Sequence, residues 1–256
     1  WNFAGGTISG NGPGPYDVIW NTAGTINVTL QVTENSFACP STTTSFPVVV
    51  KPSPVSNAGN DVSFCSGSSA TIGTSSIPNY SYSWNPPAGL SSSTASNPSV
   101  TITNSSNAVQ TTGYVVTTAS LGCSTSDTVK VTVYPIPAAG FTTPAGQCLT
   151  GNSFSFTNTG TFLPSANFQW SFGLAATPSS STAPNPAGVV FAFSGSYPIS
   201  LIIDQYGCSD TVYDYVTVYP MPSASYAPND SDGCEPFNVN FYSQANDSTV
   251  TYQWNF

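Results

Sequence analysis

Charge is scarce in this sequence, and its absence excludes several classes of function. Only 5% of the residues are charged, there is no histidine or arginine, and the two cations are Lys51 and Lys130; soluble domains typically carry about 25% charged residues. Two lysines cannot neutralise a nucleic acid backbone, so we exclude nucleic acid as a partner. Without histidine there is no Ser-His-Asp triad and no histidine metal ligand.

Carboxylates are the remaining groups that could carry acid-base chemistry, as they do in glycoside hydrolases. We interpret Asp204, Asp210 and Asp214 as residues of strand ends and turns, and we therefore expect no enzyme activity. Long apolar runs are missing too. Because no run approaches the ~18 residues that a membrane helix needs, we predict no membrane span within these residues.

Apolar residues are nevertheless plentiful. Hydrophobic residues make up 39% of the chain and aromatic residues 13%, against a net charge of −9. Disordered chains combine low apolar content with high charge, so this composition favours an ordered fold. The solubility of that fold must come from serine, threonine, asparagine and glutamine.

The sequence repeats itself with a period of about 84 residues, a feature typical of tandem arrays. Three series of residues share this spacing. They are Trp1, Trp84, Trp170 and Trp254; Cys39, Cys123 and Cys208; and Cys65, Cys148 and Cys234. The segments "VVVKPSP" (48–54), "VTVYPIP" (131–137) and "VTVYPMP" (216–222) recur at the same interval.

The period predicts the domain organisation. We expect the back part of one repeat at 1–53, whole repeats at 54–135 and 136–220, and the front part of another at 221–256. "WNF" stands at both ends, at residues 1–3 and 254–256, because both copies mark the same position in the repeat. We therefore expect the natural chain to be longer at both ends.

Alternation of apolar and polar residues predicts β-strands in every repeat. It is clearest in segments 25–33, 128–133, 153–158, 197–204 and 237–243. Clusters of Gly, Pro, Asn and Ser separate such segments, and no stretch has a helical period. Several short strands per repeat are typical of a β-sandwich, in which we expect the periodic tryptophan to fill the space between the sheets.

Two kinds of repeat are suggested by short motifs. "WNFAGG" (1–6) and "WSFGLA" (170–175) resemble the Trp-Asp-Phe-Gly-Asp-Gly signature of polycystic-kidney-disease (PKD) domains, without its acidic residues. "WNTAGTINVTLQVT" (20–33) and "FSGSYPISLIID" (193–204) are similar to a later strand of that family. The segments at 57–72, 84–92 and 95–102 resemble immunoglobulin-like repeats of large surface proteins of Bacteroidota.

The resemblance implies an all-β fold: a tandem array of immunoglobulin-like, PKD-type β-sandwich domains in an extended rod. It also implies a non-catalytic stalk of an extracellular adhesin, filament or gliding-associated protein at a bacterial cell surface, exported by type IX secretion. The implied partners are neighbouring repeats, surface glycans or other copies of the chain in a filament.

The alternative is a carbohydrate-binding or spacer module of a secreted polysaccharide-degrading enzyme. Exposed aromatic side chains would then contact the polysaccharide, and the candidates are Tyr80, Tyr82, Tyr213 and Tyr215. Alignment of these tyrosines on one exposed face would favour binding, and burial would favour the stalk.

Periodic cysteines without histidine predict disulfides in an oxidising compartment. Two pairings are open. Bridges within repeats would join Cys65 to Cys123 and Cys148 to Cys208, leaving Cys39 and Cys234 with partners outside this sequence. However, the early and late cysteines of one sandwich would lie at opposite poles, and the second pairing is therefore a Cys65–Cys208 bridge between neighbours.

Two further sites are suggested by short motifs. Asp-Ser/Thr-apolar triplets resemble the O-glycosylation sequon of Bacteroidota and make Thr128, Thr211 and Ser248 candidate sugar acceptors. "NDSDGCE" (229–235) places Asp230, Asp232 and Glu235 close together, as in a calcium loop, but without the full spacing of that motif. We interpret this segment as a turn and predict no cofactor.

Overall fold

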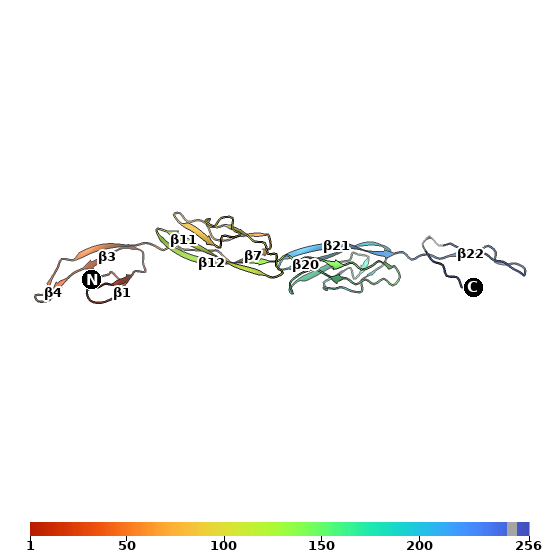
Figure 1. The fold of residues 1–256 in the computed structure, drawn as a ribbon, viewed down its shortest axis with the longest axis horizontal. Coiled ribbons are helices and arrows are strands. Elements are labelled where there is room, and N and C mark those ends of the chain that lie inside the picture. The colour runs from red at the N-terminus through yellow and green to blue at the C-terminus, as the bar shows by residue number, and fades with distance from the viewer. Residues whose placement is uncertain (245–249, 256) are drawn as a thin grey trace. The chain divides into compact units, whose positions relative to one another are not determined.

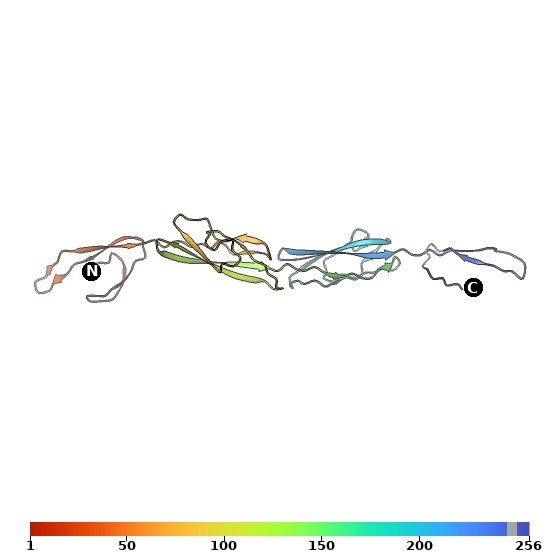
Figure 2. The same ribbon diagram turned by 45° about the horizontal axis from the view of Figure 1, so that its top comes forward.

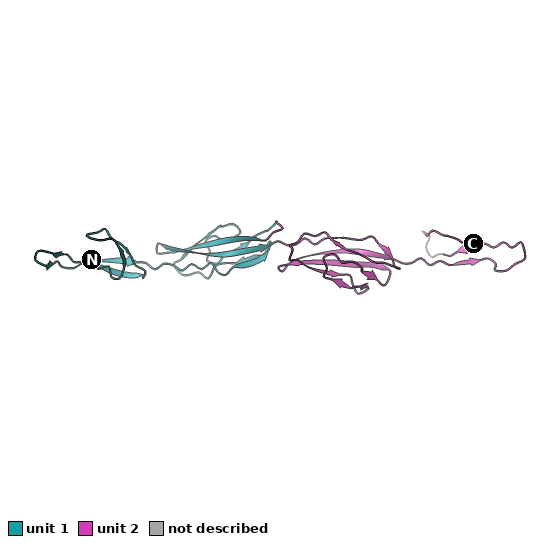
Figure 3. Ribbon diagram, turned by 90° about the horizontal axis from the view of Figure 1, so that it is seen from below, with its two compact units in different colours: residues 1–105, 109–134 teal, residues 106–108, 135–256 magenta. Residues whose placement is uncertain are grey.

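The computed structural model describes residues 1–244 and 250–255, and among these residues strands are present but no helix. The predicted all-β fold is therefore confirmed. The chain divides into two compact units, residues 1–105 with 109–134 and residues 106–108 with 135–256 (Figure 3). Each unit contains one β-sandwich with its own buried core.

The first sandwich consists of a four-stranded sheet, in the order β7-β12-β11-β9, and a two-stranded sheet of β8 and β10. Its strands are β7 (Val62–Cys65), β8 (Ser69–Thr71), β9 (Ser81–Asn85), β10 (Ser99–Thr101), β11 (Gln110–Ser120) and β12 (Cys123–Tyr134). Alternate residues of β11 and β12 are buried against the smaller sheet, as period two requires. The core includes Trp84, Val100, Tyr114 and Val131.

The second sandwich repeats this plan with a five-stranded sheet, in the order β14-β21-β20-β16-β18. The strands of this sheet are β14 (Gln147–Cys148), β16 (Asn167–Ser171), β18 (Ser180–Ser181), β20 (Gly195–Gln205) and β21 (Cys208–Tyr219). The opposite layer contains β13 (Phe141–Thr142), β15 (Thr157–Asn158), β17 (Ala176–Thr177) and β19 (Val190–Phe191). Phe156, Trp170, Phe172 and Leu201 are among its core residues.

Each sandwich contains a long hairpin, formed by β11 and β12 in the first sandwich and by β20 and β21 in the second (Figures 1 and 2). The connecting residues are Leu121-Gly122 and Tyr206-Gly207, all with positive φ, which is the geometry of a type I′ turn and favours glycine at its second position. In both sandwiches the first strand of the sheet runs parallel to the last. In both sandwiches the last hairpin and the strands of the smaller layer belong to different sheets, which is typical of an immunoglobulin-like sandwich.

The remaining segments form hairpins without a buried cluster among the described residues. At the N-terminal side these are β1 (Thr7–Ser9) with β2 (Asp17–Ile19), β3 (Gly24–Leu30) with β6 (Thr44–Val50), and β4 (Thr33–Glu34) with β5 (Cys39–Pro40). At the C-terminal side β22 (Tyr226–Pro228) pairs with β23 (Phe241–Ser243).

The periodic tryptophans have two different environments. Trp84 and Trp170 are 3% and 2% exposed, so the prediction that they fill the space between the sheets is confirmed. The same prediction is wrong for Trp1 and Trp254, which are 55% and 40% exposed. The indole of each core tryptophan donates to a backbone carbonyl, that of Ala95 at 2.8 Å and that of Ala183 at 3.0 Å.

Three predicted strands are shorter than their alternation suggests. Of segment 153–158 only Thr157–Asn158 is a strand, although Phe154 and Phe156 are buried as predicted. The reason is the partner segment, where Pro186 accepts a hydrogen bond from Phe156 but has no N–H to return. Segment 237–243 likewise keeps only Phe241–Ser243, and segment 25–33 ends its first strand at Leu30.

Candidate functional site

Two exposed tyrosines lie on the outward face of the second sandwich. Tyr213 and Tyr215 are 71% and 62% exposed and stand two residues apart in β21, so they lie on the same face of the sheet. The alternate residues of this strand, including Val216 and Val218, are buried in the core. The strand therefore presents an aromatic pair to solvent while its other face anchors it.

The register of the sheet defines the neighbours of this pair. Tyr213 lies opposite Ser200 and Tyr215 opposite Pro198 on β20. Farther along the same face, Ile202 of β20 lies opposite Gln169 of β16, and the Gln169 side chain is exposed. Aromatic rings beside amide and hydroxyl groups can bind a ligand that has both apolar and hydrogen-bonding faces.

The structure does not bring all four candidate tyrosines together. Tyr80 and Tyr82 belong to the first sandwich and are half-buried. The Tyr82 ring packs against the core, and its hydroxyl accepts a 2.9 Å hydrogen bond from the Ile77 N–H. Only Tyr213 and Tyr215 therefore form an exposed pair.

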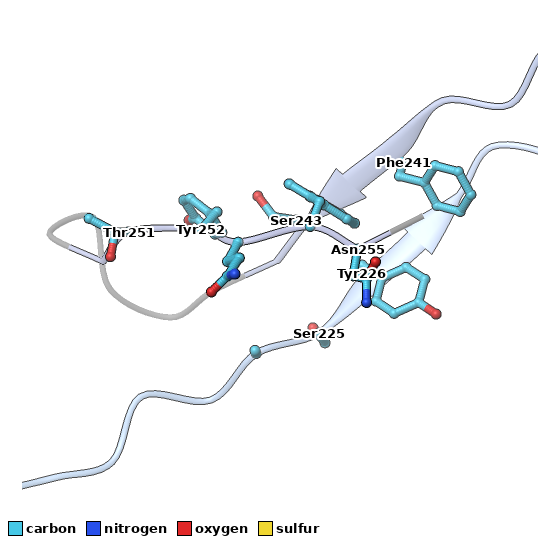
Figure 4. A pocket seen from close by; sticks show the side chains of 10 residues that line it. Ser225, Tyr226, Phe241, Ser243, Thr251, Tyr252 and Asn255 are labelled. Atoms are coloured by element: carbon cyan, nitrogen blue, oxygen red, sulfur yellow. The ribbon is translucent and has the colours of Figure 1, made fainter.

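A pocket of about 620 Å³ lies in the C-terminal hairpin segment, between β22, β23 and residues 251–255 (Figure 4). Tyr226, Phe241 and Trp254 form an aromatic cluster there, with ring centroids 5.8–6.1 Å apart. None of the described lining residues is acidic or basic. The polar side-chain groups of its described lining are hydroxyls, amides and the Trp254 indole N–H.

The same aromatic cluster recurs one period earlier, inside the second sandwich. Phe141, Phe156 and Trp170 have ring centroids 5.1–6.0 Å apart and precede Tyr226, Phe241 and Trp254 by 84 or 85 residues. In the second sandwich β20, β21 and Phe172 cover this cluster. We interpret the pocket as the uncovered counterpart of a sandwich core.

The early and late cysteines of each sandwich lie at opposite poles. Cys65 is aligned with Tyr134 at the end of β12, and Cys123 begins that strand. Eleven residues of strand span roughly 36 Å, whereas a disulfide requires Cα atoms within about 7 Å. The second sandwich repeats this arrangement, since Cys148 is aligned with Tyr219 while Cys208 begins β21.

The oxidation states agree with this geometry. Cys123 and Cys148 are free thiols, so neither bridge within a repeat is formed in the structure. Cys39 and Cys234 are free as well, whereas Cys65 and Cys208 are in the disulfide form.

The candidate glycosylation sites are accessible where the structure describes them. Thr128 and Thr211 are exposed residues of β12 and β21, and Ser248 lies outside the described residues. Asp127 and Asp210, which precede these threonines, have a structural role that the sequence motif did not reveal. Their carboxylates accept 2.8 Å hydrogen bonds from the N–H groups of Ala58 and Ala139.

These bonds tie the first segment of each sandwich to the last strand. Asp204 lies near the end of β20 and Asp210 near the start of β21, as interpreted from the sequence. Asp214 lies in the interior of β21, so its interpretation as a strand-end or turn residue is wrong. The Asp214 carboxylate accepts hydrogen bonds from the Thr143 hydroxyl and the Tyr215 N–H, which lower its pKa below the usual value.

The acidic loop at 229–235 is exposed, and the Asp230 carboxylate accepts a 3.1 Å hydrogen bond from the Asn229 side chain. Within the described ranges no three His, Cys, Asp or Glu residues cluster as a metal site would require. Nor do those residues include a helix long and apolar enough to cross a membrane.

No protein-family model matches the chain, and no relative is found among curated proteins. Solved structures that resemble it include immunoglobulin-domain arrays. The eight N-terminal Ig domains of Down Syndrome Cell Adhesion Molecule align with 86% of this chain and 34% of theirs, at 11% identity and a TM-score of 0.49. Domains 3–5 of Drosophila OTK align with 77% and 71%, at 11% identity and 0.46.

The titin fragment I67–I69 aligns with 77% of this chain and 80% of its own length, at 8% identity and a TM-score of 0.39. Similarity at this level is one of general architecture. The strand order and the two separate cores establish the immunoglobulin-like sandwiches, and the function must be argued from the residues of this chain.

Proposed function

We propose that the chain is a non-catalytic structural stalk, the repeat region of an extracellular surface adhesin or filament. One observation carries the proposal: in each sandwich a side chain of the long hairpin donates a hydrogen bond to the carbonyl of the proline through which the chain enters the domain. Thr125 Oγ1 donates to the Pro54 carbonyl at 2.8 Å, and Gln205 Nε2 donates to the Pro135 carbonyl at 2.8 Å.

These bonds restrain the segment through which the chain enters each sandwich. Pro54 and Pro135 also have φ fixed by their rings. Each bond lies within one compact unit and holds the entering segment against that unit. A defined entry point in every repeat suits a stalk built of successive domains.

The surface chemistry supports an extracellular location. Cys65 and Cys208 are in the disulfide form, which is stable in oxidising compartments. The outward face of the first sandwich carries hydroxyl side chains, with Thr117 beside Ser126 and Thr111 beside Thr132 in hydrogen-bonded pairs. Such a surface remains hydrated without many charges.

The motifs that resemble PKD and Bacteroidota immunoglobulin-like repeats support the finer assignment. We propose a large bacterial cell-surface protein of the adhesion or gliding type, exported by type IX secretion, in which neighbouring repeats are the principal partners. Exposure of Thr128 and Thr211 supports O-glycosylation in that setting, and intact mass measurement of protein from the native source should show added hexose.

Small-angle X-ray scattering tests the stalk. A single compact globule of 256 residues would have a radius of gyration of about 18 Å. We expect a value at least about 1.5 times larger, unchanged by moderate salt because few charges are present. A value near the globular limit would contradict a stalk.

A second function, carbohydrate binding, is favoured by the exposed pair Tyr213 and Tyr215. The test is affinity electrophoresis against a panel of soluble polysaccharides, using the chain and its Tyr213→Ala/Tyr215→Ala variant. Binding should require both rings, and Phe46→Ala, which removes an aromatic side chain that is 70% exposed elsewhere, should leave it unchanged. If no polysaccharide retards the chain, the pair has no such role.

A further inference from the structure

We propose that the exposed pair Tyr213 and Tyr215 selects one class of glycan, a neutral β-1,4-linked polysaccharide whose ring hydroxyls are all equatorial. The inference rests on carbohydrate binding, the second function proposed above, and names the ligand of that site. It concerns the second sandwich alone and is independent of the stalk.

The repeat itself does not require the tyrosine pair. Strands β12 and β21 both begin at a cysteine, have 12 residues and end at a tyrosine. Counted from the cysteine, the positions of Tyr213 and Tyr215 are occupied in the first sandwich by Thr128 and Lys130. β12 forms the same long hairpin with these polar residues. Because the hairpin forms without aromatic residues at these positions, we attribute the two rings to recognition of a ligand.

Short side chains surround the pair on the adjacent strand. Ser200 and Pro198 of β20 lie opposite Tyr213 and Tyr215, and neither side chain is long enough to cover a phenol ring. The rings are accordingly 71% and 62% exposed. An exposed aromatic ring can stack against a flat apolar surface, and the face of a sugar ring that carries only C–H groups is such a surface.

The spacing of the two rings sets the geometry of the ligand. Residues two apart in a strand are separated by about 6.6 Å along the strand, which is comparable with the length of one hexose unit. Consecutive sugars of an extended chain that runs parallel to β21 can therefore each contact one tyrosine.

The linkage of the polymer decides which sugar faces the tyrosines meet. In a β-1,4-linked chain consecutive sugars are turned over, so Tyr213 and Tyr215 contact opposite faces of their two sugars. Both faces must then be free of axial hydroxyls. That condition is met when every ring hydroxyl is equatorial.

A row of serines extends from the pair across the sheet. Ser200 of β20 lies opposite Tyr213 and also opposite Ser171 of β16. Ser180 of β18 lies opposite Ser171. Neighbouring strands are about 4.8 Å apart, and each serine hydroxyl can donate and accept a hydrogen bond. Equatorial hydroxyls point sideways from a stacked sugar, so the row provides partners on the side toward which they point.

The charge of the second sandwich excludes anionic glycans. Residues 136–220 include Asp204, Asp210 and Asp214 but no lysine or arginine. This sandwich therefore has no cationic side chain to pair with a uronate or sulfate group, and juxtaposed like charges oppose binding. We infer that the ligand is uncharged.

Two cellulose derivatives test the charge of the ligand by affinity electrophoresis of the full chain. Hydroxyethyl cellulose is neutral, whereas carboxymethyl cellulose carries carboxylates on the same β-1,4-linked glucose backbone. We expect the neutral polymer to retard the chain and the anionic polymer to retard it at least about fivefold less.

Two soluble hexamers test the stereochemistry. The β-1,4-linked hexamers of glucose and mannose differ in the 2-hydroxyl, which is equatorial in glucose and axial in mannose. Titrations of the full chain are followed in ¹H–¹⁵N correlation spectra. The glucose hexamer should bind about tenfold more tightly, and the peaks that shift should belong mainly to β20 and β21.

Substitutions test the assignment to the pair. Tyr213→Ala and Tyr215→Ala should each weaken binding of the glucose hexamer about tenfold. The double variant Tyr213→Phe/Tyr215→Phe keeps both rings and should retain most of the affinity. Phe193→Ala removes an aromatic side chain of the same sandwich that is 69% exposed, and it should leave binding unchanged. The spectra of the variants also show whether each one folds.

The outcomes separate the ligand class from the function on which it rests. Binding that needs the pair but is equally tight for the mannose hexamer, or equally strong with carboxymethyl cellulose, would overturn the ligand class and leave carbohydrate binding in place. Binding that survives the loss of both rings would overturn the site. A chain that binds neither polymer and neither hexamer would overturn the inference, and the wider polysaccharide panel then decides whether carbohydrate binding fails with it.

Discussion

Gln205 Nε2 donates a 2.8 Å hydrogen bond to the carbonyl oxygen of Pro135, while Gln205 Oε1 accepts a 2.7 Å hydrogen bond from the Leu163 N–H. The glutamine side chain is only 1% exposed. Both polar ends are therefore satisfied inside the second sandwich, and one of them fixes the proline through which the chain passes into it.

Gln205→Ala should destabilise the second sandwich by about 2–4 kcal/mol, because it leaves a buried carbonyl and a buried N–H without partners. Urea denaturation followed by circular dichroism measures the loss. Gln169→Ala, which truncates an exposed glutamine of the same sandwich, should change the stability by less than about 0.5 kcal/mol. Equal effects from both variants would show that Gln205 contributes nothing specific.

Trp84→Ala and Trp170→Ala should each cost about 3–5 kcal/mol, because each removes a large buried side chain from a separate core. Calorimetry should show that each substitution lowers the transition of its own sandwich and leaves the other in place. The double variant should show the sum of both effects. Trp1→Ala, which removes a tryptophan that is 55% exposed, is the matched control and should have little effect.

Gly207 has a φ of +79° in the turn between β20 and β21, and an added Cβ would meet no atom within 4 Å. Gly207→Ala should therefore cost roughly 1–2 kcal/mol from backbone conformation alone. Gly207→Asn should recover part of this loss, since asparagine adopts positive φ more readily. Identical denaturation curves for the alanine variant and the unaltered chain would rule out a left-handed residue at this turn.

Asp214 provides a test by pH. Its pKa is lowered by the Thr143 hydroxyl and the Tyr215 N–H, so the stabilising effect is present above the unfolded pKa and is lost as pH falls through the folded pKa. Thr143→Val should raise the pKa of Asp214 toward its ordinary value, as followed by NMR of the carboxyl carbon. The effect on stability should be small because the group is exposed.

Alternation and periodicity were sufficient to predict the architecture in several places. The segments at 128–133 and 197–204 lie within β12 and β20, whose alternate residues are buried. Trp84 and Trp170 are in the core because the repeat places them between two layers. The alternation of apolar and polar residues predicted strands reliably where one face of the strand is buried and the other is exposed.

Elsewhere the decisive information came from partners distant in the sequence. The strand expected at 153–158 is reduced because Pro186 cannot complete the ladder. Asp127 and Asp210 resembled parts of a glycosylation motif, but their hydrogen bonds to Ala58 and Ala139 depend on strand pairing across about 70 residues. The exposure of Tyr213 and the partial burial of Tyr82 likewise followed from tertiary packing.

The central claim is that each whole repeat is a sandwich with its own core. The most direct test compares ¹H–¹⁵N correlation spectra of the full chain and of residues 135–220 expressed alone, a fragment that keeps the Pro135 carbonyl. We expect a dispersed spectrum from the fragment, with peaks that superimpose on those of the same residues in the full chain. Poor amide proton dispersion in the spectrum of the fragment, alongside a dispersed spectrum of the full chain, would contradict the claim.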